Sequence, residues 1–433
     1  MPSTSTTIPD DALFLCVDCG GTKTAVAVAN REGQVIARST GGPSNFAYLG
    51  ASNFLRTVQT SIEDVLKVVY AAKGDDEENG EKWRLPPNAS QRPPFFAAWF
   101  GVSGVDSPAN VALLTPQLAA LLALPSELGS DRLVICNDTH LLAAPLQLYR
   151  DVNSAVCVIG GTGSISASFR RGKSRNDANG NTTGQMLEPL ARVGGWGWIL
   201  GDEGGGFDAG RTAVRMILRE YELAVLHGEG EDGVDGSSGP GKVLAKSSWL
   251  VREVLRVFGV QEPPELLVTV HDPDPATDPE PESNSTTTNE DPLGAANHFL
   301  HLNAPHTRTL PREKRLSQLA PLVFTAAFTH NDTLALRVLE SCAMSLAEQT
   351  IFLLRPTPDL DAVNATNSRA VDARDSLLTF GGSLVGVEQY RDMVVRALEK
   401  QGHVFRAVEY VGDAAGTGAK GLAGYFVGGA TRV

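Results

Sequence analysis

Two short segments place glycines and hydroxyl groups directly after an apolar run, and the first of them adds a lysine. They lie within "FLCVDCGGTKTAVAVAN", which starts at residue 14, and "AVCVIGGTGSISASF", which starts at residue 155. Glycine lets backbone amides approach an anion without a Cβ in the way, and hydroxyl and ammonium groups add further donors. We call residues 20–24 the first tip and residues 160–164 the second tip. Their candidate phosphate-binding residues are Gly20, Gly21, Thr22, Lys23, Gly161, Thr162, Gly163 and Ser164.

A third glycine-rich segment lies near the end of the chain, in "FGGSLVG". We call Gly381, Gly382 and Ser383 the third tip. A single Gly-Gly-Thr would favour a tight structural turn, but two at equivalent places of a repeated unit, plus a third, favour a nucleotide clamped from opposite sides. The chain contains no Walker A sequence, so the phosphate site is not a P-loop.

Asp18 ends the first strand-like run, immediately before the first tip. A carboxylate there repels phosphate unless a cation stands between them, and a magnesium ion would resolve that conflict. The alternative is an aspartate that accepts hydrogen bonds from its own turn amides.

Asp138 stands at the carboxyl end of the strand-like run "LVICND", before a helical stretch. It could cap that helix, or act as a general base where a substrate hydroxyl meets the γ-phosphoryl group, and these roles are compatible. Asp106, after "WFGVSGV", is the second candidate for the base.

The segment "VGGWGWILGDEGGGFDAG", residues 193–210, combines two tryptophans, glycines and adjacent carboxylates. An aromatic ring beside backbone amides and a carboxylate is typical of a sugar site, because the ring covers a pyranose face while the carboxylate binds hydroxyls. The alternative is a hydrophobic plug over the domain junction.

The composition limits the classes of partner. A formal net charge of -13 argues against nucleic acid or an anionic membrane as the main partner. The amino terminus lacks the features of a secretory signal and no apolar run approaches the roughly 20 residues of a membrane span, so we expect a cytoplasmic protein. Cys16 and Cys19 form a CxxC pair, but strand alternation sends them to unlike surroundings, which favours buried thiols over a redox or metal pair.

The pattern of elements indicates an α/β protein with an internal repeat. Strand-like runs at 13–17, 25–29 and 35–38 form a meander. Further strands are predicted at 95–104 and 132–138, and helices at 52–72, 108–124, 139–148 and 206–226. The strand, tip and strand then recur from Ser154. Two inserts lie near 228–241 and 272–292. Their composition favours solvated loops over segments with a regulatory or partner-binding role.

Together these segments resemble a known family. The blocks "VDCGGTKTAVAV", "GPSNFAYLG", "VICNDTHLLAA", "VIGGTGSISASF", "GGWGWILGDEGGGFDAGR" and "LTFGGSLVG" occur in order. They resemble the N-acetylglucosamine kinases, within the BadF/BadG/BcrA/BcrD ATPase group of the actin, Hsp70 and hexokinase superfamily. The resemblance implies two ribonuclease-H-like lobes, residues 1–150 and 151–433, with a cleft between them.

The resemblance also implies residue roles. Thr22, Thr162 and their neighbouring glycines would bind ATP phosphates, and Ala320 with the third tip would lie near the adenosine. Asp138 would be the catalytic base. The sugar-binding residues would be Asn45, Phe46, Asp138, Gly195, Trp196 and Asp202, and Asp18 would hold Mg²⁺.

Two positions depart from the family pattern. Cys19 stands where close relatives often have glycine, and Phe46 stands where the animal enzymes have histidine. The second change removes one polar contact to the sugar. It leaves the choice of hexosamine open: N-acetylglucosamine remains the favoured substrate, with glucosamine and N-acetylmannosamine as the alternatives.

The resemblance therefore implies a kinase that transfers phosphate from Mg-ATP to the 6-hydroxyl of N-acetylglucosamine. The expected partners are the small amino sugar and ATP, with a homodimer left open and with no nucleic acid or membrane. Two alternatives belong to other classes: a non-catalytic sugar sensor, and an ATPase that drives a partner protein.

Overall fold

The computed structural model describes most of the chain. The described residues are 8–72, 83–88, 91–127, 130–172, 175–176, 182–183, 186–228, 239–275, 307, 309–356 and 369–429. The two predicted inserts fall largely outside these residues.

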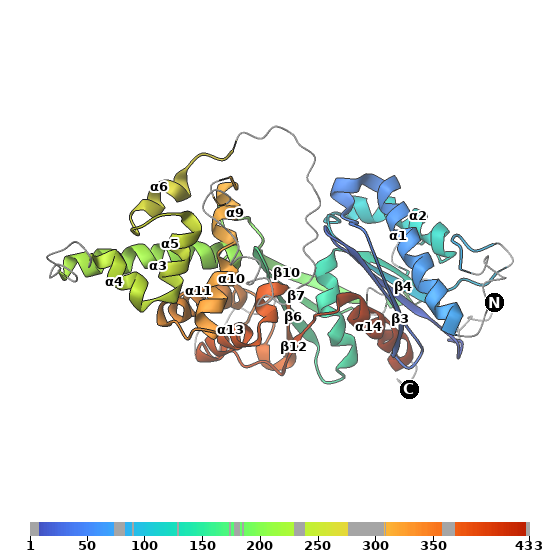
Figure 1. Cartoon of the computed structure of the whole chain (residues 1–433). Helices are drawn as coiled ribbons and strands as arrows, with labels where there is room; N and C mark the ends of the chain where they lie inside the picture. Colours follow the sequence, from blue (N-terminus) through green and yellow to red (C-terminus); the bar gives the residue numbers. More distant parts are fainter. Residues whose placement is uncertain are drawn as a thin grey trace.

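The first half builds a five-stranded mixed sheet, which we call the first sheet (Figure 1). Its strand order is β3-β2-β1-β4-β5; β1, β2 and β3 pair antiparallel, whereas β1, β4 and β5 run parallel. The elements are β1 (Phe14–Cys19), β2 (Thr24–Ala29), β3 (Val35–Gly41), α1 (Phe46–Ala72), β4 (Ala97–Val102), α2 (Pro108–Leu122), β5 (Leu133–Cys136) and the 3-10 helix η2 (Asp138–Leu148).

The second half repeats this arrangement. The second sheet has the order β10-β7-β6-β11-β12, with β6, β7 and β10 antiparallel and β6, β11 and β12 parallel. Its strands are β6 (Ser154–Gly160), β7 (Ser164–Arg171), β10 (Leu187–Gly194), β11 (Ser376–Gly381) and β12 (Ala407–Tyr410). Both sheets thus share the ribonuclease-H-like order, which confirms the predicted α/β fold of two lobes; the interlobe cleft stays a prediction.

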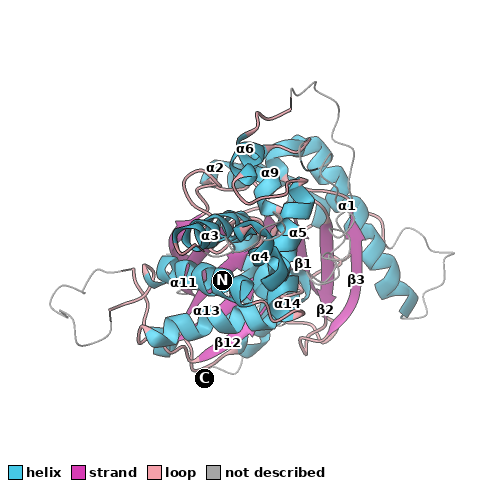
Figure 2. Ribbon diagram, turned by 60° about the vertical axis from the view of Figure 1, so that its left-hand side comes forward, coloured by secondary structure: helices cyan, strands magenta, loops and turns pink. Residues whose placement is uncertain are grey.

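Helices cover the sheets (Figure 2). In the second half these are α3 (Gly206–Leu226), α4 (Pro240–Ser247), α5 (Trp249–Phe258), α6 (Glu265–His271), α9 (Arg312–Ser317), α10 (Ala320–Phe328), α11 (Thr333–Ile351), the 3-10 turn η4 (Ala373–Asp375), α12 (Ser383–Gly386), α13 (Glu388–Lys400) and α14 (Ala414–Gly429). A two-stranded ribbon, β8 (Arg175–Asn176) with β9 (Thr182–Thr183), completes the set.

The first long helix starts earlier than the expected residue 52. Helix α1 begins at Phe46, and Gly50 breaks its regular path with a φ of 67°. The amide of Tyr48 donates to the Asn45 side chain (3.3 Å), which supplies the first turn with a partner for an otherwise unsatisfied amide. The apolar periodicity does not reach this capped turn, so the sequence pattern missed it.

Three hydrophobic clusters form the core. One lies between the first sheet and helices α1 and α2, and a second joins the second sheet to α3, α5, α10, α11 and α13. The third includes Phe14 and Trp99 of the first sheet, Cys157 and Leu377 of the second, and residues of η2 and α14. Helix η2 contacts strands of both sheets, and α14 packs against η2 and the first sheet.

Helix α14 comes from the end of the chain but lies beside the first sheet, with η2 (Figure 1). A Cβ on Gly418 would lie 2.3 Å from the Cys16 sulfur, and one on Gly421 would lie 2.8 Å from the carbonyl oxygen of Ala144. Glycine therefore permits this close approach. The division into residues 1–150 and 151–433 stays a prediction, and α14 is the element that crosses it.

Strand alternation separates the two cysteines of the CxxC pair. Cys16 belongs to the cluster shared by the two sheets, whereas Cys19 belongs to the cluster under α1 and α2. Both are buried free thiols, which confirms the preference for buried thiols. Among the described helices, none is long and apolar enough to cross a membrane.

Candidate active site

The carboxyl ends of the two sheets meet at the start of η2. A Cβ on Gly101, near the end of β4, would lie 2.5 Å from the Leu141 side chain. A Cβ on Gly381, at the end of β11, would lie 2.7 Å from the Leu142 side chain. The first and second tips follow β1 and β6, which run parallel to β4 and β11. Both tips therefore lie at the sheet ends that flank the beginning of η2.

The first tip is a tight turn joined to the segment before α1. The amide of Gly20 donates to the Lys23 carbonyl (3.0 Å), and the Gly20 carbonyl accepts from the Ser44 amide (2.9 Å). The buried Thr24 hydroxyl also donates to the Ser44 hydroxyl (2.7 Å). Thr22 is exposed at the apex, where its hydroxyl can meet a ligand.

The second tip repeats this turn and rests on a helix N-terminus. The amide of Gly161 donates to the Gly163 carbonyl (2.9 Å), and Thr162 is again exposed. The amides of Gly206 and Phe207, at the start of α3, donate to the carbonyls of Gly161 (2.8 Å) and Thr162 (3.1 Å). These bonds satisfy amides of the first helical turn and fix the tip in place.

The third tip and the α9–α10 junction both adjoin the second tip. Gly382 has a φ of 102°, and a Cβ there would lie 2.7 Å from the Gly160 carbonyl oxygen. A Cβ on Gly206 would lie 3.5 Å from both the Ser317 carbonyl oxygen and the Thr162 Cα. Ala320 follows Ser317 at the start of α10, with its side chain only 3% exposed. The structure thus brings together three segments assigned to the nucleotide.

Asp18 carries a strongly perturbed carboxyl group. Burial, and then the charge of Asp138, raise the pKa of Asp18 to about 6, although Lys23 partly offsets them. Among the described residues, none donates a hydrogen bond to this carboxylate; the Gly20 amide goes to Lys23 instead. A half-buried carboxylate without donors, beside a second carboxylate, suits a cation better than a turn-forming role.

The described residues contain no group of three or more acidic, histidine or cysteine side chains that could hold a metal ion. Mg²⁺ commonly keeps several waters and binds through one or two carboxylates plus substrate phosphates. Asp18 beside the phosphate-facing tips fits that mode.

Asp138 is the first residue of η2, but it does not occupy the cap position. The Asn137 side chain accepts from the Thr139 amide (3.0 Å) and also donates to Asp106 (3.0 Å). Burial raises the pKa of Asp138, while hydrogen bonds from the Thr139 amide and the Ser103 hydroxyl act to lower it. Since Asn137 is the cap, capping does not explain the aspartate.

Ser103 joins Asn45 to Asp138 and was not singled out from the sequence. The Asn45 amide donates to the Ser103 hydroxyl oxygen (3.1 Å), and that hydroxyl donates to the Asp138 carboxylate. Gly104 makes room for this contact: its φ is 85°, and a Cβ there would lie 2.9 Å from Asn45 Oδ1. The only local signal was a small polar residue at the carboxyl end of a buried strand.

Phe46 faces away from this polar chain. Its ring is 9% exposed and packs edge-on against Phe54, with ring centroids 5.7 Å apart. Its backbone amide donates to the Ser103 carbonyl (2.9 Å). The residue therefore holds Asn45 and Ser103 together through its backbone, and its predicted part in sugar binding stays a prediction.

The loop that carries Trp196 and Trp198 is attached to the second tip through the backbone of Ser164. The Ser164 carbonyl accepts from the Gly195 amide (2.9 Å), and the Ser164 amide donates to Asp202 Oδ1 (3.2 Å). Trp196 is 60% exposed, so it does not plug the core, whereas Trp198 packs against Phe207 with ring centroids 5.3 Å apart.

Asp202 stands in a strained position. Its φ is 66°, which non-glycine residues seldom adopt and which is often found at functional sites. A Cβ on Gly163 would lie 2.5 Å from Asp202 Oδ1, so a glycine at that position of the tip is needed for the carboxylate to approach. Oδ2 accepts no hydrogen bond from any residue that the structure describes.

Comparison with known proteins gives one family and several relatives. Residues 15–185 match the model of the BadF/BadG/BcrA/BcrD ATPase family. An N-acetyl-D-glucosamine kinase of Dictyostelium discoideum is 26% identical over 209 residues, which are 48% of this chain and 54% of that protein. An N-acetylmuramic acid/N-acetylglucosamine kinase of Clostridium acetobutylicum is 24% identical over 217 residues, 49% of this chain and 57% of that protein. The chain thus matches about half the length of these curated relatives.

Among solved structures, a Chromobacterium violaceum protein provisionally assigned as an N-acetylglucosamine kinase is similar over 96% of this chain and 100% of its own. The sequence identity is 18% and the TM-score is 0.48.

Proposed function

We propose that the protein is an ATP-dependent kinase acting on the 6-hydroxyl of N-acetylglucosamine. Residues 15–185 match the model of the BadF/BadG/BcrA/BcrD ATPase family. The names of the curated relatives, both kinases of N-acetylated amino sugars, support this substrate class. The tips, the buried carboxylates and the exposed tryptophan supply the groups that the reaction needs.

One observation carries the proposal: each candidate sugar-binding segment is hydrogen-bonded to a candidate phosphate-binding tip, or directly follows a residue that is. On the first sheet, the Gly20 carbonyl binds the Ser44 amide, next to Asn45. On the second sheet, Ser164 of the tip binds both Gly195 and Asp202. A site built in this way keeps acceptor and donor side by side, which is the main task of a phosphoryl-transfer enzyme.

In this proposal, different groups of the chain bind the phosphates of ATP and the sugar. Backbone amides and the Thr22 and Thr162 hydroxyls of the two tips bind the phosphates of ATP. Asn45 and Asp202 bind sugar hydroxyl or amide groups, and the Trp196 ring covers an apolar face of the sugar. Residues of both lobes thus contribute, so closure of the lobes would align the reactants and exclude water, which otherwise competes as acceptor.

Asp138 acts as the general base. Its carboxylate accepts the proton of the 6-hydroxyl while the sugar oxygen bonds to the γ-phosphorus and the bond to the β,γ-bridging oxygen breaks, which releases ADP. Ser103 orients the carboxylate through its hydrogen bond. Asp18 would hold hydrated Mg²⁺, which neutralises phosphate charge when bound.

Release of ADP that depends on an amino sugar tests the proposal. With Mg-ATP, the protein should release ADP when N-acetylglucosamine is added and much less with water alone. Glucosamine and N-acetylmannosamine serve as the comparison sugars, because Phe46 removes one polar contact expected at the site. The position of the phosphate is read from the product by NMR, and we expect it on O6.

Two results would contradict the proposal. Equal ATP hydrolysis with and without sugar would favour an ATPase that drives a partner protein. Binding of sugar and nucleotide without any ADP release, from any hexosamine, would favour a non-catalytic sensor.

A further inference from the structure

Gly204 lies in the loop between Asp202 and α3, and its backbone is held on both sides by buried side chains. Its amide donates to Asp208 Oδ2 (2.8 Å), and its carbonyl accepts from the Tyr390 hydroxyl (2.8 Å). Asp208 belongs to α3 and Tyr390 to α13, so two helices that are far apart in the sequence bind the backbone of one residue, on either side of its Cα.

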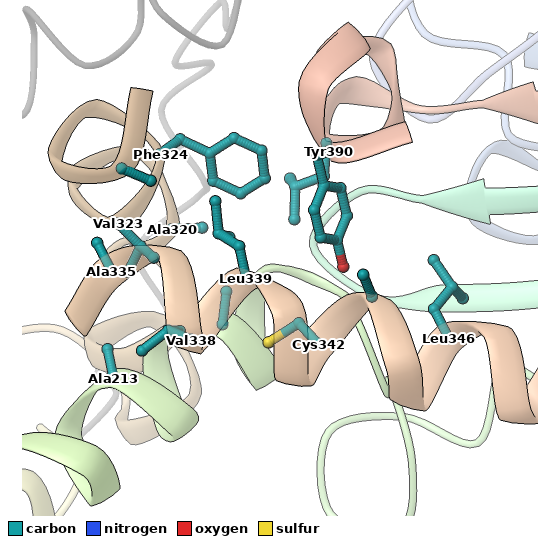
Figure 3. Close-up of a cluster of buried hydrophobic side chains, with 14 of the residues drawn as sticks. Ala213, Ala320, Val323, Phe324, Ala335, Val338, Leu339, Cys342, Leu346 and Tyr390 are labelled. Carbon is teal, nitrogen blue, oxygen red and sulfur yellow. The ribbon is translucent and has the colours of Figure 1, made fainter. Parts of the chain in front are cut away.

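The space around Gly204 admits no other residue. Its φ is 74°, and a Cβ there would lie 2.6 Å from the Leu346 side chain and 2.8 Å from the Cys342 carbonyl oxygen. Figure 3 shows the Tyr390 ring with its hydroxyl directed towards helix α11, near Cys342. The loop is therefore pressed against α11 at the point where Tyr390 and Asp208 hold it.

The Tyr390 hydroxyl and the Asp208 carboxylate, which bind Gly204, are themselves held in place. Tyr390 is fully buried, and burial raises its pKa well above the usual value, so the hydroxyl stays protonated and keeps its role as donor. The other oxygen of Asp208, Oδ1, accepts from Arg211 (2.8 Å) and from the Thr212 hydroxyl (3.2 Å). These contacts engage both oxygens of the Asp208 carboxylate and so restrict its movement.

Gly204 is connected to the second tip through its neighbours Gly205 and Asp202. The Gly205 amide donates to the Asp202 carbonyl (2.9 Å), and the Asp202 side chain accepts from the Ser164 amide (3.2 Å). A fixed Gly204 therefore helps to maintain the strained φ of Asp202, because such conformations persist only where the surroundings determine them.

We propose that Tyr390 and Asp208 are positioning residues for the nucleotide site: through Gly204 they hold Asp202, and so the backbone of the second tip, in the geometry that binds phosphate. The hydrogen bonds that the structure describes for these two side chains go to Gly204, Arg211 and Thr212, none of which belongs to a tip. The inference rests on the proposed ATP site, and it assigns α13 and the α3 interior a part in that site.

A double-mutant cycle tests this role, with the dissociation constant for Mg-ATP measured by calorimetry. Tyr390→Phe removes only the hydroxyl, and we expect it to weaken Mg-ATP binding about fivefold or more, the effect of one lost buried hydrogen bond. In the Asp202→Ala background the same change should weaken binding less than about twofold, because the contact through which it acts is gone. Asp208→Asn is the second variant and should show the same dependence on Asp202.

Ser376→Ala is the matched control. Its hydroxyl is buried in the second sheet, 2.7 Å from the Ser154 hydroxyl, at the start of β11 and so at the end of the sheet opposite the tips. It should lower the melting temperature as Tyr390→Phe does and leave the affinity for Mg-ATP unchanged in both backgrounds. A Tyr390→Phe protein with reduced stability but wild-type affinity would overturn the proposal, as would an equal loss with and without Asp202.

The readout also separates this inference from the proposed function. Mg-ATP affinity is measured without sugar, so an absence of sugar-dependent ADP release would refute the kinase proposal while the cycle still decides the role of Tyr390.

Discussion

Asp138→Asn should lower kcat for sugar phosphorylation by about 10²–10⁴, the usual contribution of a general base. The amide has nearly the same shape and can still accept the Ser103 hydroxyl, but it cannot take the proton of the 6-hydroxyl. The Asn137 cap of η2 is untouched, so the fold and the affinity for Mg-ATP should be retained. Steady-state ADP release and calorimetric titration of Mg-ATP measure the two quantities.

Asp106→Asn is the control for Asp138→Asn. Asp106 also lies past the carboxyl end of a strand and binds Asn137 (3.0 Å), and it was the second candidate for the base. Its replacement should change kcat only slightly. A large loss with Asp106→Asn and a small one with Asp138→Asn would exchange the two roles.

Asp18→Asn should stabilise the protein above neutral pH and abolish its Mg-dependent activity. The folded protein raises the pKa of Asp18 from 3.8 to about 6, so it binds this proton more tightly than the unfolded chain does. Stability is therefore lost as the pH rises from about 4 to about 6, and the loss persists at higher pH. Replacing the carboxyl group removes this penalty, about 1–2 kcal/mol after allowance for solvent screening.

Melting temperatures across a pH series measure this effect. The gain of Asp18→Asn over the wild type should be larger at pH 8 than at pH 5, where the wild-type group is already mostly protonated. Addition of Mg-ATP should raise the melting temperature of the wild type more than that of the variant. A variant that is less stable than the wild type at pH 8 would show that Asp18 serves the fold instead.

Much of the fold followed from local patterns. The strand, tip and strand around Gly20 and again around Gly161 predicted two similar sheets, because alternating apolar residues and glycine turns are determined by nearby sequence. Helix α3 was predicted with its observed bounds, since its apolar face has clear helical spacing. The same local logic placed Asp18 and Asp138 at strand ends.

Other features depend on contacts between distant segments. Helix α14 was missed because its many glycines disfavour a helix, whereas tertiary packing against Cys16 and Ala144 requires them. Ser103 was missed because its partner Asn45 is remote in sequence. The capping role of Asn137 could not be distinguished from that of Asp138, since adjacent Asn and Asp are equally good caps. In each case the deciding interaction is long-range or depends on one rotamer.

The central claim is that the first and second tips hold one triphosphate between them, and titration of Mg-ATP into the wild type, Thr22→Val and Thr162→Val tests it most directly. We expect one ATP per chain, with each substitution weakening that single site about tenfold or more, the effect of losing a hydrogen bond to a charged group. Two independent ATP sites, or an affinity for Mg-ATP that one of the two substitutions leaves unchanged, would contradict the account.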